Sequence, residues 1–180
     1  MSTKKTAGRL FFGHGKDKVF LEPVKNTLAV RHKASAKAQV RKMLGTLGEL
    51  SEIESKRLLV VHLPGGVKVE SALQKLQPLL DKEKIECVFP VLLDKESKLL
   101  QVLTDEITVR FKPTVDAKKR KQIEKEFGLT VARKNESVPN QFVVTAPGAE
   151  GLDTLKLANK LDAEDEVEFA TPNFVSEHKR

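Results

Sequence analysis

The sequence repeats itself, and this repeat constrains the fold more than any other feature of the chain. Residues 28–33 (LAVRHK) return about eighty residues later as residues 107–112 (ITVRFK). Two further blocks return in the same order: LLVVHLPG at 58–65 as QFVVTAPG at 141–148, and IECVFPVL at 85–92 as VEFATPNF at 167–174. In a chain of 180 residues, such a repeat predicts two compact units of similar structure.

The second copy shows its elements most clearly. Ile107, Val109 and Phe111 alternate with polar residues, which indicates a half-buried strand. After Pro113, a helix capped by Thr114 or Asp116 and ending before Gly128 is predicted. The same reasoning predicts strands at 129–133, 141–146 and 167–170 and a helix over 152–161. The first copy has the same order, β-α-β-β-α-β.

This order predicts an α+β fold of two tandem ferredoxin-like sandwiches. A hairpin is expected before each sandwich, at 10–21 and at 91–100. We place the first module at 8–90, the second at 91–175 and an extended C-terminal tail at 176–180. The strand 58–63 is apolar on both faces, so a covered second face is expected there. The predicted core of the second copy consists of Ile107, Val109, Phe111, Ile123, Phe127, Phe142, Val144, Leu155, Leu161, Val167 and Phe169.

The composition favours a binding protein over an enzyme. The one cysteine, Cys87, excludes an internal disulfide and is expected to be buried. The histidines His14, His32, His62 and His178 have no metal-ligand spacing, and no nucleophile motif or phosphate loop occurs, so no cofactor or metal is expected. The net charge of +7 and the element order leave open a basic nucleic-acid adaptor of RNA-recognition-module topology. That alternative is weakened because the strands lack the aromatic platform on which bases stack.

Four blocks of the second copy resemble the N-terminal pro-region of subtilisin-like serine proteases. They are EITVRFKP at 106–113, FGL at 127–129, NQFVV at 140–144 and VEFATPNF at 167–174. The resemblance covers about seventy residues, from Glu106 to Val175, and the first copy carries a degenerate version of the last block. It implies an intramolecular chaperone and inhibitor whose open sheet face packs on the protease.

The resemblance also implies a site in this chain, because the pro-region's extended tail lies in the protease cleft. Pro172 and Asn173 would position the tail, and the protease-binding residues would be Phe174, Val175, Ser176, Glu177, His178, Lys179 and Arg180. The expected partner is a subtilisin-like protease, in cis or in trans, with no small-molecule substrate, nucleic acid or membrane. A structural interaction domain is a further alternative. If Met1 is the natural start, a cytoplasmic location is expected, since no signal peptide follows it.

Overall fold

The computed structural model describes residues 10–13, 18–149 and 151–176, which combine helices with antiparallel strands as the α+β prediction requires. The strands are β1 (Leu10–Phe12), β2 (Val19–His32), β3 (Glu49–Ile53), β4 (Leu58–His62), β5 (Ile85–Asp94), β6 (Leu100–Phe111), β7 (Thr130–Lys134), β8 (Gln141–Thr145) and β9 (Val167–Ser176). The helices are α1 (Lys37–Gly45), α2 (Val69–Asp81), α3 (Ala117–Glu126) and α4 (Leu152–Asp162), with 3-10 turns η1 (Ala34–Ala36) and η2 (Glu54–Lys56).

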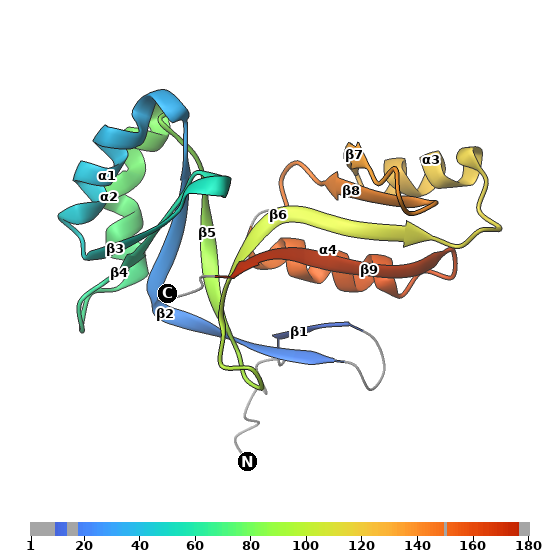
Figure 1. The fold of residues 1–180 in the computed structure, drawn as a ribbon, viewed down its shortest axis with the longest axis horizontal. Helices are drawn as coiled ribbons and strands as arrows, with labels where there is room; N and C mark the ends of the chain where they lie inside the picture. Colours follow the sequence, from blue (N-terminus) through green and yellow to red (C-terminus); the bar gives the residue numbers. More distant parts are fainter. Residues whose placement is uncertain (1–9, 14–17, 150, 177–180) are drawn as a thin grey trace, which may run out of the picture.

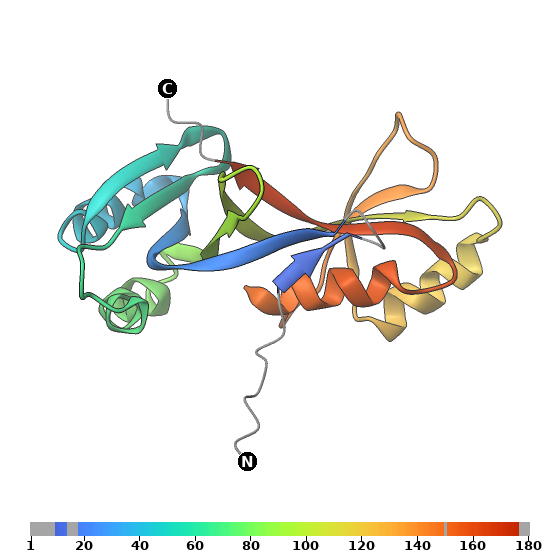
Figure 2. The ribbon, with the colours of Figure 1, turned by 90° about the horizontal axis from the view of Figure 1, so that it is seen from below.

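Two lobes with the same element order lie side by side (Figure 1). We call residues 24–90 the first half and residues 104–173 the second half. The strand order is β3-β4-β2-β5 in the first half and β7-β8-β6-β9 in the second, and every pairing is antiparallel. In the second half α3 and α4 lie on the same side of β6 and β9 (Figure 2).

A layer of shorter strand segments joins the halves. This central layer consists of β1, residues 19–23 of β2, 91–94 of β5, 100–103 of β6 and 174–176 of β9. Both predicted hairpins lie here: Leu10 pairs with Leu21, and Leu93 pairs with Leu100. Asp94 fixes the second turn by accepting the Ser97 hydroxyl at 2.6 Å, whereas residues 14–17 of the first turn lie outside the described residues.

Each half buries one sheet face under its own helices. In the second half Ile107, Phe111 and Phe142 form this core, with Ile123 supplied by α3 and Leu161 by α4. Helix α3 begins where predicted, since the Asp116 side chain accepts the backbone N–H of Lys119 at 2.7 Å. Phe127 packs at the edge of this core.

Two predicted core residues lie elsewhere. Leu155 packs in the central layer with Leu21, Leu92 and Leu103. Phe169 is half-buried and pairs with Arg110, whose side chain points away from the helices. The cause is an irregularity at Glu168, which lets both Val167 and Ala170 reach the core and breaks the strict alternation that the prediction assumed.

The second face of β4 is covered, as its two-sided apolar pattern predicts. Leu58 and Val60 are fully buried on the face opposite the helices, together with Ala29 and Phe89. Val102 of β6 and Val175 of β9 complete this cluster, so the cover comes from the central layer. Cys87 lies at its margin and is half-buried, more exposed than the sequence suggested.

Candidate functional site

The site begins with a bulge in β6, at the point where the strand passes from the central layer into the second half. Leu103 pairs with Phe174 and Ile107 pairs with Pro172, so Thr104, Asp105 and Glu106 together face the single residue Asn173. Extra residues in one strand bend it and leave its polar groups without ladder partners. Such groups need other hydrogen bonds when they are buried.

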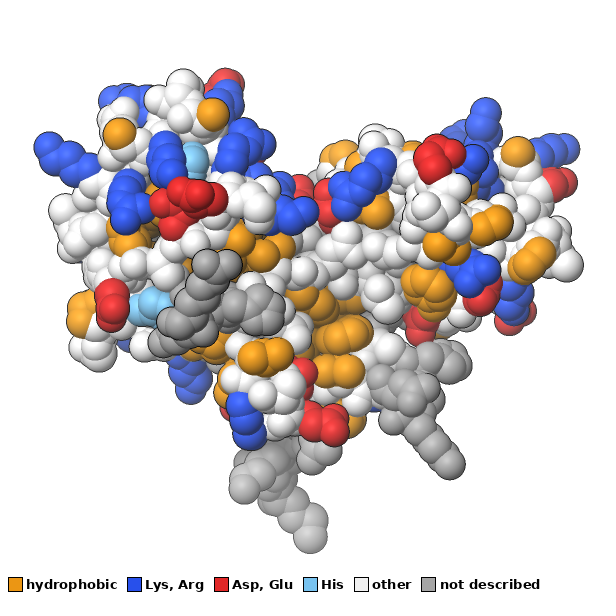
Figure 3. Space-filling model, in the orientation of Figure 1, with side chains coloured by type: hydrophobic (Ala, Val, Ile, Leu, Met, Phe, Trp, Pro, Cys, Tyr) orange, Lys and Arg blue, Asp and Glu red, His pale blue; other side chains and the backbone are white. Residues whose placement is uncertain are grey.

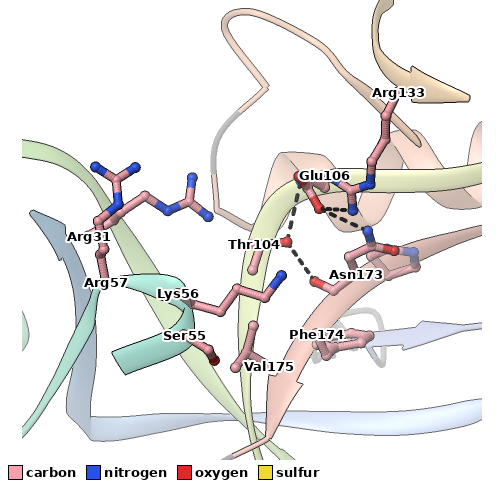
Figure 4. Close-up of a pocket in the computed structure, with 11 residues that line it drawn as sticks. Arg31, Ser55, Lys56, Arg57, Thr104, Glu106, Arg133, Asn173, Phe174 and Val175 are labelled. Carbon is pink, nitrogen blue, oxygen red and sulfur yellow. Dashed lines mark hydrogen bonds and ion pairs between the residues drawn. The ribbon is translucent and has the colours of Figure 1, made fainter. Parts of the chain in front are cut away.

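Within the bulge, the backbone N–H of Glu106 donates to the Thr104 hydroxyl at 3.4 Å. Asn173 links the side chains around it. Its amide nitrogen donates to Glu106 Oε2 at 3.1 Å, and its amide oxygen accepts the Thr108 hydroxyl at 2.7 Å. The backbone carbonyl of Asn173 accepts the buried Thr104 hydroxyl at 2.9 Å. Asn173 therefore bonds to several residues of the bulged strand, of which Figure 4 shows Thr104 and Glu106.

Glu106 connects this network to the outer strand β7. Both of its carboxylate oxygens accept bonds from Arg133, at 2.9 and 3.0 Å. These bonds, and with them the one from Asn173, hold the pKa of Glu106 below its usual value, although partial burial opposes the shift. A bidentate salt bridge of this kind is both strong and directional.

The first half forms the opposite wall of a groove. Arg31 and residues 55–57 face Thr104, Glu106, Arg133 and the strand segment 172–175 across a cavity of about 440 Å³. We call this cavity the inter-half groove; Figure 3 shows the notch between the lobes, bordered by charged side chains, and Figure 4 shows its lining. The Arg31 guanidinium reaches Asp105 at 3.1 Å, and Arg57 reaches Glu86 at 2.9 Å.

The sheet faces that point away from the helices differ between the halves. In the first half this face carries Ala29, Leu58, Val60 and Phe89, and it is buried. The residues with the same pairing positions in the second half are Thr108, Gln141, Val143 and Thr171. Three of these four are polar and half-buried, and we call this surface the open face.

The predicted tail residues divide into described and undescribed parts. Strand β9 runs to Ser176, beyond the predicted 167–170, so Pro172 lies inside the strand rather than at its exit. The Phe174 ring packs on that of Phe12 at 5.0 Å, and Ser176 pairs with Gln101. The remaining predicted tail residues, Glu177, His178, Lys179 and Arg180, lie outside the described residues.

Sequence reasoning missed the residues that hold Asn173. Thr104, Glu106, Thr108 and Arg133 come from two strands and look like ordinary polar strand positions. One signal was available: TDEIT at 104–108 places three polar residues in a row before the alternating strand, which is typical of a bulge.

Neither a group of metal ligands nor a membrane-spanning helix is found in the part of the chain that the structure describes. Within residues 10–13, 18–149 and 151–176, no three His, Cys, Asp or Glu side chains group closely enough to hold a metal ion. None of the described helices is long and apolar enough to cross a bilayer.

Comparison with known proteins points to proteases. Residues 94–173 match the family model of the fervidolysin N-terminal prodomain. This stretch begins at the second hairpin and ends at Asn173, so it contains the whole second half. No solved structure matches the chain significantly.

Two curated relatives carry the same printed name, calcium-dependent protease. The one from Nostoc sp. is 25% identical over 148 residues, which are 82% of this chain and 22% of the relative. The one from Trichormus variabilis is 31% identical over 90 residues, 50% of this chain and 14% of the relative. The chain therefore spans only a minor part of the length of either protein.

Proposed function

We propose that this chain is the pro-region of a subtilisin-like serine protease, or a free-standing relative of one, and that it inhibits and chaperones that protease without being catalytic itself. The observation that carries the proposal is the prodomain match over residues 94–173. This match falls on the half whose sheet face is open. The relatives named as proteases, which match over 22% and 14% of their length, are consistent with it.

The chain is proposed to be a duplication of one ferredoxin-like module. The two halves share the element order and the strand order. They also share two irregularities, a bulge before Leu28 and before Ile107 and a register shift after Arg31 and after Arg110. Shared irregularities favour duplication because regular strand pairing alone would not require them.

The second half is the one that docks on the protease. A sheet face can bind a partner only if it is not already packed, and the corresponding face of the first half is filled by Val102 and Val175. The first half then acts as a support, because it holds the central layer and, through it, the end of β9. This division gives each copy a different task.

The C-terminal tail is proposed to occupy the protease cleft. An extended segment binds a cleft by main-chain pairing, with alternate side chains in pockets. Residues 174–176 are already extended and paired with β6. Because these residues are already ordered by pairing, less ordering entropy would oppose the binding of a tail that continues them.

The test is inhibition of the Nostoc calcium-dependent protease freed of the segment that this chain matches. Intact chain should inhibit peptide hydrolysis, and chain lacking residues 177–180 should inhibit orders of magnitude more weakly. Ser176 is kept in the shortened chain because it pairs with Gln101. Equal inhibition by both chains would exclude the tail mechanism, and no inhibition by either would exclude a role toward this enzyme.

A further inference from the structure

The last strand belongs to two layers. Residues 167–173 of β9 pair within the second half, and residues 174–176 pair with β6 in the central layer. The change of layer occurs at Asn173, opposite the bulge. Whatever fixes Asn173 therefore fixes the angle between the open face and the end of the chain's last strand.

The first half closes the corresponding bulge in another way. Pro23 pairs with Leu92 and Leu28 pairs with Pro90, so residues 24–27 of β2 face the single residue Val91. Val91 is buried in the apolar cluster under the central layer. The polar groups of this bulge bond in the other direction, Asn26 to Leu63 and Thr27 to His62. The fold therefore does not require a polar side chain at the position of Asn173, where the first half has Val91.

The polar network adds directional control. The Asn173 side-chain amide is hydrogen-bonded at both ends: its oxygen accepts from Thr108, and its nitrogen donates to Glu106. Arg133 in turn binds both carboxylate oxygens of Glu106. Apolar packing has no comparable angular preference. Beyond Asn173, the Phe174 ring rests on Phe12. The strand end is thus held on both sides of the crossing point.

We propose that Asn173, oriented by Glu106, Arg133 and Thr108, is a positioning residue that sets the course of residues 174–176 relative to the open face. Its consequence for inhibition rests on the function proposed above: the protease would meet the open face and the tail at a fixed angle. Asn173 and Glu106 would then act through the tail rather than by touching the protease.

The strand angle can be measured without any protease. Two nitroxide labels report the distance between the outer strand β7 and the end of β9, measured by pulsed electron paramagnetic resonance. They are attached at Ala132→Cys and Ser176→Cys in a Cys87→Ser background. Asn173→Val introduces the residue type that the first half has at the equivalent position, Val91. This variant should broaden and shift the distance distribution. Thr145→Val, an isosteric change on the same face with no bond to Asn173, should leave it unchanged.

A second variant distinguishes a change in the strand angle from unfolding of the chain. Thr108→Val is isosteric and removes only one bond to Asn173, so it should broaden the distribution in the same direction while the circular-dichroism melt stays cooperative. An unchanged distribution in Asn173→Val and Thr108→Val would overturn the proposal. Equal broadening in Thr145→Val would also overturn it, because the effect would then be a general loosening of the sheet.

A double-mutant cycle measured by inhibition tests whether Asn173 positions the tail or contacts the protease. It combines Asn173→Val with removal of residues 177–180. With the same Nostoc enzyme, Asn173→Val should weaken inhibition by the intact chain about tenfold, the cost of one hydrogen bond to a charged group. In the chain lacking residues 177–180 it should have no effect. An equal loss in both chains would show that Asn173 acts on docking and would overturn the proposal. If wild-type chain does not inhibit, the proposed function fails, whereas the label distances still decide the role of Asn173.

Discussion

Leu58 and Gln141 occupy equivalent positions in the two halves: each begins the third strand of its half and pairs with an arginine of the first strand. The partners are Arg31 and Arg110. Leu58 is fully buried under the central layer, whereas Gln141 is half-buried on the open face. One position in a common strand pattern therefore has two environments, and each residue type suits its own.

Exchanging these two residue types should have unequal effects. Leu58→Gln removes a buried side chain and places an amide among apolar groups, so the free energy of unfolding should fall by about 3 kcal/mol or more. Gln141→Leu, the matched control, should change it by less than about 0.5 kcal/mol. Urea denaturation measures both, and similar losses would contradict the assignment of the two faces.

Protonation of Glu106 should weaken the second half in acid. The pKa of Glu106 is lowered in the folded chain by Arg133 and then by Asn173. Its carboxylate therefore contributes stability that is fully present above the ordinary pKa of 4.5 and is lost as the pH falls through the lower folded value.

Glu106→Gln isolates this contribution from those of other carboxylates. At pH 7 the variant should be less stable than wild type by about 1.5–3 kcal/mol, the range for a hydrogen bond to a charged group. The difference should shrink as the pH falls below 4.5. Thermal melts from pH 7 to pH 3 test this, and a difference that stays constant would rule out the pair as a source of acid sensitivity.

Gly48 should tolerate no side chain. A Cβ at this position would lie 2.1 Å from the backbone oxygen of His62, which forms part of β4. Gly48→Ala must push the turn away from the strand, and it should cost about 2–3 kcal/mol, the upper range for overpacking. Gly45→Ala is the control, since its Cβ would meet only Leu50 at 3.8 Å in an α-helix. It should be neutral or stabilising by about 0.5–1 kcal/mol, as thermal melts of both variants would show.

Truncating Phe111 should lower the free energy of unfolding more than truncating Phe127, because the two differ in burial within the core of the second half. Phe111 is 2% exposed and packs edge-on against Phe142 at 6.1 Å, so Phe111→Ala should cost about 3–5 kcal/mol. Phe127 follows the last turn of α3 and is half-buried, so Phe127→Ala should cost roughly half as much. Denaturation of both variants by guanidinium gives the order, and a larger loss at Phe127 would mean that α3 packs more deeply than described.

The sequence predicted the local elements well because their signals are local. Strand alternation, the Asp116 cap and both hairpins lie where the residues indicate. The two-sided apolar pattern of the predicted strand 58–63 also predicted a covered face correctly. Strand ends were less predictable: β9 continues to Ser176 because residues 174–176 find a partner in β6, which the sequence of β9 does not reveal.

The candidate site was predicted only in part. Asn173 and Pro172 were singled out through a resemblance, but Glu106, Thr108 and Arg133 were not. Their roles depend on a bulge that brings separate strands together, and a bulge shifts side chains from one face to the other. The same effect moved Phe169 out of its predicted core place.

The sequence by itself determined the repeated order of elements, since hydrophobic periodicity and turn residues act over a few neighbouring positions. Only the tertiary structure decided that the central layer covers one of the two equivalent faces and leaves the other open. That choice depends on contacts between distant segments, such as Val175 with the cluster of Leu58 and Val60. Such contacts are selected by the free energy of burying apolar surface in three dimensions, a quantity that no local pattern of residues contains.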